Sequence, residues 1–150
     1  MKKTWVLALL ICGTATAQKS NLSLESIFNE VTPKVVEWRR YFHEHPELGN
    51  REFNTSKKVE ETLQRLGIST KKIAKTGIVG VLQGGKPGPV VALRADMDGL
   101  PVEERNGLAF ASKAKGEYNG TTVPVMHACG HDSHIAMLLG AAEVLSKIKN

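Results

Sequence analysis

The segment MHACGHDSH, residues 126–134, holds one of the two cysteines and three of the five histidines in the chain. Cys129 and His131 are separated only by Gly130, and a backbone that bends at this glycine can direct a thiolate and an imidazole toward one point. These two groups are good ligands for zinc and similar divalent ions. Two ligands do not complete a metal site, so such a site would need donors from elsewhere in the chain.

The same segment supports two other interpretations. Cys129 would be a nucleophile if one of the neighbouring histidines served as its base, and the dipole and free amides of a helix that follows would lower the pKa of its thiol. In the third interpretation the segment has no chemical role, and Cys129 is simply a buried cysteine beside surface histidines. The density of donors favours the metal, but the residues alone leave all three interpretations open. The candidate bases are His127, His131 and His134.

A second polar group follows an apolar run, at Arg94-Ala95-Asp96-Met97-Asp98. In an extended chain alternate side chains point to the same face, so Asp96 and Asp98 should lie on one side. Ligands collect at the carboxyl ends of strands in open α/β sheets, which makes both aspartates candidates for binding a metal or orienting a ligand. A solvated turn, in which the aspartates cap backbone amides, explains the same pattern equally well.

Two helices are predicted before the first strand. Apolar residues recur at intervals of three and four from Leu24 to Phe42, as they do on the buried face of a helix. Thr32-Pro33 interrupts this stripe and predicts either two helices or one kinked helix, and His45-Pro46 should end it. A second helix is predicted from 55 to 66, with Gly67 as its stop.

Short runs rich in isoleucine and valine predict strands at residues 70–73, 77–82 and 89–94. The turn sequence GGKPGP at residues 84–89 predicts that the last two strands form a hairpin. The run at 89–94 has no polar alternation, which indicates burial on both faces inside a sheet. Residues 99–127 are predicted to form a long loop, and a loop of this length in a compact domain is usually functional or poorly ordered.

The last predicted element is a helix. Its apolar stripe extends from Ile135 to Ile148, and Asp132 or Ser133 is expected to cap its start. Both polar groups would then lie at the ends of apolar elements. Helices, then strands, then a helix indicate an α/β fold in one domain.

The chain begins with the pattern of a secretory signal peptide, at residues 1–17. Lys2 and Lys3 precede an apolar run, and Ala15-Thr16-Ala17 supplies a cleavage pattern. The apolar run is well short of the roughly 20 residues that span a bilayer, so we expect export to the periplasm or out of the cell and no stable membrane insertion. The mature domain would comprise residues 18–150.

Cleavage of this leader would also change the thiol content and the charge of the protein. Cys129 would be the only thiol left after the loss of Cys12, which excludes an internal disulfide. The formal net charge of +5 would fall to +3, with 18 basic against 15 acidic residues and no long basic block. This mild surplus gives little reason to expect nucleic-acid binding.

Four segments between Glu37 and Leu145 carry a resemblance to a known family; in chain order they are WRRYFHEHPELGNRE, TGIVGVLQG, PGPVVALRADMDGLPVEE and VMHACGHDSHIAMLLGAAEVL. They resemble the amidohydrolases that include hippurate hydrolase, N-acyl-amino-acid amidohydrolase and the indole-acetyl-amino-acid conjugate hydrolases, within the metallopeptidase group of aminoacylases and carboxypeptidases. The resemblance implies the amino-terminal part of a zinc-peptidase-like catalytic domain, with helices first, a mixed sheet, and a helix after the metal-ligand loop.

The resemblance further implies an enzyme with two divalent metal ions, zinc, manganese or cobalt, that hydrolyses the amide bond of N-acyl amino acids or similar conjugates. Cys129 and His131 match the first two metal ligands of the family. Asp98 matches the active-site aspartate that supports a ligand and helps to organise the metals. The wider group has His-x-Asp where this chain has Asp96-Met97-Asp98, so the role of Asp96 stays open.

Members of this family place the general-base glutamate, further metal ligands and a smaller domain for dimerisation and site closure after these four segments. We therefore expect the 150-residue chain alone to lack amidohydrolase activity. The complete enzyme is expected to be a homodimer that acts on a small molecule. The alternative is a non-catalytic remnant or binding module that keeps the family pattern without its chemistry.

Overall fold

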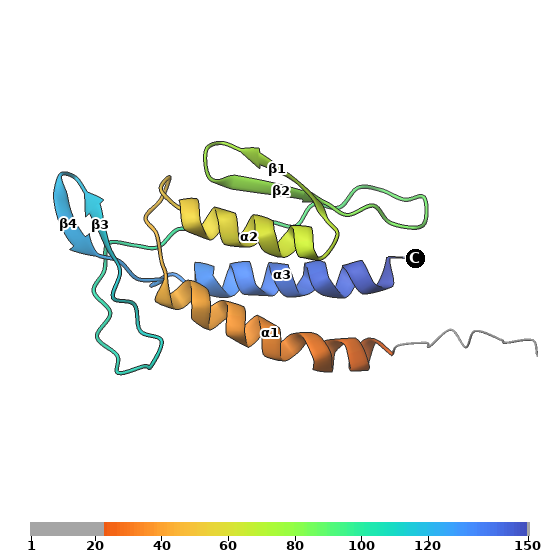
Figure 1. Ribbon diagram of the computed structural model, residues 1–150, viewed down its shortest axis with the longest axis horizontal. Helices are drawn as coiled ribbons and strands as arrows, with labels where there is room; N and C mark the ends of the chain where they lie inside the picture. Colours follow the sequence, from red (N-terminus) through yellow and green to blue (C-terminus); the bar gives the residue numbers. More distant parts are fainter. Residues whose placement is uncertain (1–22, 150) are drawn as a thin grey trace, which may run out of the picture.

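The computed structural model describes residues 23–149, so the predicted signal peptide and Cys12 lie outside the described residues. In chain order, the elements are α1 (Leu24–Glu44), α2 (Phe53–Arg65), β1 (Ser69–Ile73), β2 (Gly77–Val81), β3 (Lys115–Tyr118), β4 (Thr121–Pro124) and α3 (His131–Ile148). The three helices lie side by side; β1 and β2 lie next to α2, while β3 and β4 lie at the end where α1 stops and α3 begins (Figure 1). No helix between residues 23 and 149 is long and apolar enough to cross a membrane.

Helix α1 continues through Pro33, so the predicted interruption leaves one helix rather than two. The hydroxyl of Thr32 donates to the carbonyl oxygen of Phe28 at 2.7 Å instead of capping a new helix. Proline removes one backbone hydrogen bond from the helix, but the packing of α1 along α3 holds both halves in line. The helix ends at Glu44, directly before His45-Pro46, as predicted.

Helices α1 and α3 run antiparallel and pack closely against each other (Figure 1). Gly140 of α3 permits this approach, because a Cβ atom there would lie 2.5 Å from Cγ2 of Val35 in α1. The buried core between the helices is formed by Phe42, Ile135 and Leu139. This packing places the amino end of α3 beside the carboxyl end of α1.

The start of α3 differs from the prediction. The N-cap residue is Gly130, in the left-handed conformation with φ at 86°, and no side chain caps the helix. Asp132 is only 1% exposed, and its carboxylate bonds Arg39 and His43 of α1. The predicted cap at Asp132 or Ser133 is wrong, because the Asp132 carboxylate is engaged by a neighbouring helix.

The second predicted helix is confirmed as α2, and Gly67 follows it with a positive φ of 72°. Strand β2 pairs with β1, not with residues 89–94, so the hairpin predicted around GGKPGP is wrong. The pairing is antiparallel, with Ile73 opposite Gly77. Ala74 and Lys75 between the strands have φ values of 46° and 70°, left-handed conformations that suit a tight hairpin connection.

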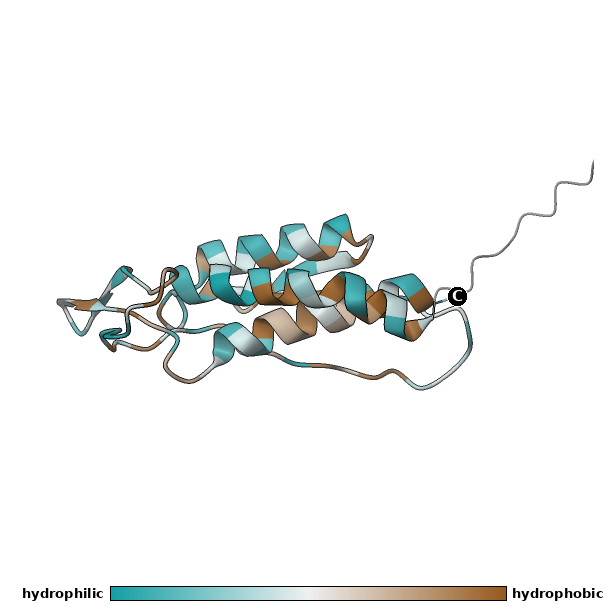
Figure 2. Cartoon of the chain, turned by 90° about the horizontal axis from the view of Figure 1, so that it is seen from below, coloured by the Kyte–Doolittle hydropathy of each residue, from teal (hydrophilic) through white to brown (hydrophobic). Residues whose placement is uncertain are grey.

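Residues 89–94 form no strand, and their apolar side chains are exposed; Val90 is 99% exposed and Val91 79%. The prediction of an interior strand is therefore wrong for the part of the chain that the structure describes. An extended segment becomes a strand only where neighbouring strands pair with its backbone groups, and none of the residues 23–149 does so. The segment runs along the helices, with brown apolar stretches in Figure 2.

The predicted loop at residues 99–127 contains a second antiparallel hairpin, formed by β3 and β4. Asn119-Gly120 forms its turn, with φ values of 51° and 76°. Isolated bridges join Leu48 to Gly99 and Leu100 to Met126, and so hold the chain beside both polar groups. Helices combined with these small antiparallel sheets confirm the α/β class.

Candidate metal centre

His131, the first residue of α3, lies between the two aspartates that were predicted to share one side. Its Nδ1 donates to Asp98, whose Oδ1 lies at 2.9 Å and whose backbone oxygen lies at 3.0 Å. Its Nε2 lies 3.5 Å from Oδ2 of Asp96. The prediction for Asp96 and Asp98 is confirmed, since both carboxylates reach the same imidazole ring.

His134 joins this site one helical turn later, because residues three apart lie on the same face of a helix. Its ring stacks on His131 with the centroids 5.4 Å apart, and its Nδ1 lies 2.6 Å from Oδ1 of Asp96. Ligand atoms of Asp96, His131 and His134 all lie within 4.8 Å of one another, and we call these three residues the donor group. The side chains of Asp96 and His134 are 42% and 46% exposed, so the donor group faces solvent.

The donor group fits a divalent cation. Carboxylate oxygens and imidazole nitrogens are ligands of zinc, manganese and similar ions. The hydrogen bond with His134 holds the pKa of Asp96 below its ordinary value of 3.8, so this carboxylate is ionised at neutral pH. Since Asp98 engages Nδ1 of His131, Nε2 is the nitrogen left for a cation, and a carboxylate behind a ligating imidazole orients it.

Cys129 does not lie in the donor group. Its thiol is free and exposed, and its sulfur is not among the ligand atoms that lie within 4.8 Å of one another. The bend expected at Gly130 is present, with φ at 86°. The assignment of Cys129 as a metal ligand stays a prediction, as do the roles assigned to His131 and Asp98.

His127 is 5% exposed, and neither of its ring nitrogens has a hydrogen-bond partner within residues 23–149. Burial lowers the pKa of His127 below its ordinary value of 6.5, so the ring is neutral at pH 7. Buried polar atoms without partners reduce the stability of a fold. The charges of Asp98 and Asp132 both act on this ring. His127 therefore lies near the metal centre and near a group of buried charged side chains that includes Asp132.

Those buried charges are arranged around His43, near the end of α1. Nδ1 of His43 lies 2.7 Å from Oδ2 of Asp132, and Nε2 lies 2.8 Å from Oε1 of Glu104. Arg39, one turn earlier, binds the same oxygen of Asp132 through Nε at 3.1 Å. The side chains of Asp132 and Glu104 are 1% and 0% exposed. We call His43, Asp132, Glu104 and Arg39 the His43 network.

Residues 92–150, which include the whole donor group, match the model of Peptidase family M20/M25/M40. Thermostable carboxypeptidase 1 of Saccharolobus solfataricus is 50% identical over 129 residues, or 85% of this chain and 31% of the relative. N-acyl-L-amino acid amidohydrolase of Geobacillus stearothermophilus is 45% identical over 85% of this chain and 32% of the relative. The chain is related to the M20/M25/M40 peptidases. The family resemblance predicted from four segments is thereby confirmed.

Two solved structures have a similar fold over most of this chain. A dinuclear metal binding peptidase of the M20 family from Bacillus subtilis matches with a TM-score of 0.71 and 37% identity, over 81% of this chain and 32% of that one. A putative aminohydrolase from methicillin-resistant Staphylococcus aureus matches with a TM-score of 0.74 and 39% identity, over 84% and 30%. The M20-related chain spans about a third of the length of the curated relatives it matches.

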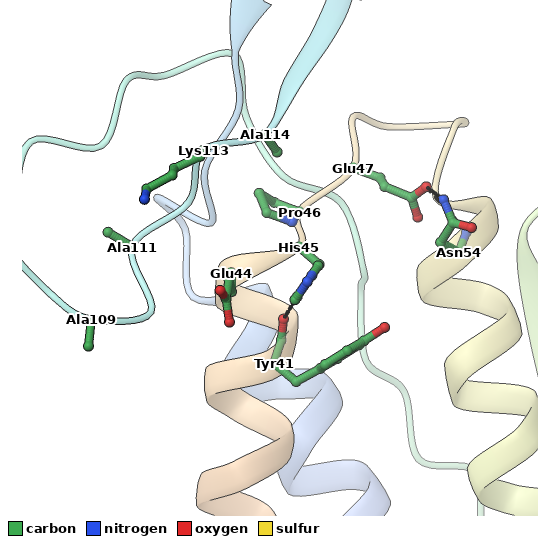
Figure 3. A pocket seen from close by; sticks show the side chains of 10 residues that line it. All are labelled: Tyr41, Glu44, His45, Pro46, Glu47, Asn54, Ala109, Ala111, Lys113 and Ala114. Carbon is green, nitrogen blue, oxygen red and sulfur yellow. Dashed lines mark hydrogen bonds between the residues drawn. The ribbon is translucent and has the colours of Figure 1, made fainter.

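The surface of residues 23–149 in this M20-related chain includes a larger and a smaller hollow near the end of α1 and Asp98. The larger, of about 550 Å³, has the end of α1 on one side and the segment with Ala111 and Lys113 on the other (Figure 3). No residue of the donor group lines it, so size alone does not locate the site. A smaller hollow of about 420 Å³ is lined by Asp98 and Gly99, and it adjoins the metal centre through the bond between Asp98 and His131.

Sequence reasoning left four of these residues without a role. Asp96 was open because the family pattern differs there, and the family resemblance assigned no ligand role to His134, although both lie within the two polar groups. His43 and Glu104 gave a weaker signal. His43 directly follows the apolar stripe of α1, a polar side chain beside a buried face, but only the fold brings it to Glu104.

Proposed function

We propose that this chain supplies the amino-terminal part of the catalytic domain of a metal-dependent amidohydrolase. The observation that carries the proposal is the donor group, in which one carboxylate and two imidazoles converge within 4.8 Å. N-acyl amino acids or similar amide conjugates are the proposed substrates, in line with the name of the Geobacillus relative. Two divalent ions are proposed for the complete site, in line with the dinuclear Bacillus subtilis peptidase. Export through residues 1–17 and homodimerisation belong to the same proposal.

The residues of the chain prepare this site in three ways. Asp98 holds Nδ1 of His131, which leaves Nε2 available for a cation. Asp96 adds a negative charge that favours cation binding, and the exposed sides of Asp96 and His134 leave an amide substrate room to approach. When bound, divalent cations in such sites polarise a carbonyl oxygen and lower the pKa of water.

Cys129 is proposed as a further ligand, on the family pattern alone. A thiolate would favour zinc, whereas carboxylate and imidazole donors also suit manganese and cobalt. The donor group offers three ligand atoms, fewer than two ions require. We therefore propose that the 150-residue chain binds metal without hydrolysing amides.

Metal binding is tested first, by calorimetric titration of the purified chain with zinc, manganese and cobalt. We expect saturable binding that His131→Ala abolishes. The matched control is His45→Ala, an exposed histidine whose Nδ1 bonds the backbone oxygen of Tyr41, and this variant should bind like the unmodified chain. Failure of the unmodified chain to bind any of the three ions, or equal binding by His131→Ala, would contradict the proposal.

Hydrolysis is then assayed with hippurate and N-acetyl amino acids, on the 150-residue chain and on any longer protein encoded by the same gene. We expect cleavage only by a longer protein, inactivated by a chelator and restored by metal. Cleavage by the 150-residue chain would overturn the proposal that this chain binds metal without hydrolysing amides. Metal binding without cleavage by either protein would support a non-catalytic module, and inactivation by iodoacetamide irrespective of metal would support Cys129 as nucleophile.

A further inference from the structure

His43 has a carboxylate partner at each of its ring nitrogens. Nδ1 lies 2.7 Å from the carboxylate of Asp132, and Nε2 lies 2.8 Å from that of Glu104. Arg39 binds the same oxygen of Asp132, and buried carboxylates need such partners. The ring of His43 is therefore held in place from both sides.

The two partners of His43 belong to the two chain segments that bear the donor group. Asp132 directly follows His131 in the first turn of α3. Glu104 lies shortly after Asp98, in the segment that leaves the metal centre. The second oxygen of Glu104 accepts a hydrogen bond from the amide of Ser112, which anchors this segment further. His43 therefore connects the first turn of α3 to the segment after Asp98. Its two hydrogen-bond partners, Asp132 and Glu104, are not members of the donor group.

We propose that His43 is a positioning residue for the metal centre. By holding the first turn of α3 to the segment after Asp98, the ring of His43 sets how far the imidazoles of His131 and His134 lie from Asp96. Its effect passes through Asp132, the neighbour of His131 in the chain. This inference rests on the proposed metal site, because His43 has a positioning role only if the donor group binds a cation.

A second polar contact between the same two helices provides a matched control. Nζ of Lys34 in α1 bonds Oε1 of Glu143 in α3, and Glu143 is 4% exposed. This contact also joins α1 to α3 through a buried carboxylate, but it lies about two and a half helical turns before His43 along α1. Loss of Lys34 should loosen the packing of the helices without displacing the first turn of α3.

The test compares His43→Gln and Lys34→Met with the unmodified chain, using Co²⁺ alone as the probe. Affinity is measured by calorimetry, the geometry of the bound ion by its visible absorption spectrum, and the fold by circular dichroism and thermal unfolding. We expect both variants to unfold at lower temperature. Only His43→Gln should weaken Co²⁺ binding, by about tenfold to a hundredfold, the range for residues that orient metal ligands, and should alter the Co²⁺ spectrum.

The outcomes separate this inference from the proposed function. If the unmodified chain binds no Co²⁺, both are overturned. If it binds Co²⁺ and His43→Gln binds with the same affinity and spectrum, the positioning role is overturned while the metal site stands. If His43→Gln does not fold, Glu104→Gln replaces it, because that variant keeps the bond between His43 and Asp132; weaker binding with an altered spectrum supports the inference, and unchanged binding overturns it.

Discussion

Asp98 accepts a hydrogen bond from Nδ1 of His131 at 2.9 Å, while the opposite nitrogen of the same ring lies 3.5 Å from Asp96. The two carboxylates therefore have different relations to the ring. Asp98 fixes its orientation, aided by the Asp98 backbone oxygen at 3.0 Å, whereas Asp96 lies on the side that faces His134 and the solvent. The spacing of Asp96 and Asp98 alone did not distinguish the two aspartates, and only the family resemblance assigned a role to Asp98.

Removal of the orienting carboxylate should weaken metal binding without removing a ligand. We expect Asp98→Ala to lower zinc affinity by about tenfold to a hundredfold, because the ring of His131 loses the partner that holds it in place. Calorimetric titration measures the change. Glu103→Ala, which deletes an exposed carboxylate paired with Arg105, controls for the loss of charge and should bind as before.

Replacement of the thiol tests the ligand that the family pattern assigns. Cys129→Ser should lower the affinity for zinc more than that for manganese, because thiolate is the softer donor. His134→Ala should lower both affinities, since it removes an imidazole from the donor group. Competition titrations with the two ions give the ratio. An unchanged zinc affinity in Cys129→Ser would contradict Cys129 as a ligand.

The free energy of unfolding should decrease as the pH falls below about 4.5, because Glu104 then becomes protonated. Burial raises the pKa of Glu104, but hydrogen bonds from His43, Ser112 and Asn106 outweigh burial and hold this pKa below its ordinary value of 4.5. The unfolded chain therefore binds more protons at this position than the folded chain just below pH 4.5. The contribution of Glu104 to the free energy of unfolding is complete above pH 4.5 and is lost as the pH falls through the lowered, folded-state pKa.

Urea unfolding at about pH 7 and about pH 4 measures this contribution. Glu104→Gln should be less stable than the unmodified chain at the higher pH and should lose less stability between the two. Glu103→Gln, at a neighbouring exposed position, serves as the control and should follow the unmodified chain. An equal acid loss in Glu104→Gln and the unmodified chain would show that other carboxylates cause it.

The contact between α1 and α3 should not tolerate a side chain at Gly140. A Cβ atom there would lie 2.5 Å from Cγ2 of Val35, so Gly140→Ala should destabilise the chain by about 1–3 kcal/mol through overpacking. Gly107→Ala, where nothing lies within 4 Å, should be tolerated. Thermal unfolding measures both, and adding Val35→Ala to Gly140→Ala should restore part of the loss.

Local patterns predicted the helices well and the strand pairing poorly. The stripe from Leu24 to Phe42 and the stop at Gly67 depend on neighbours in the chain, and both are present in the structure. Residues 89–94 carry an equally clear strand pattern, yet they pair with nothing in residues 23–149. Hydrogen bonding in a sheet needs a partner distant in the chain, and an apolar run does not specify one.

The sequence by itself determined the family resemblance, the α/β class and the two polar groups, and it predicted roles for Asp98, Cys129 and His131. Only the tertiary structure decided that Asp96 and His134 meet at His131, and that His43 lies between Asp132 and Glu104. The physical reason is that these contacts join residues up to 89 positions apart in the chain. Their geometry follows from the packing of α1 against α3, which no local spacing encodes.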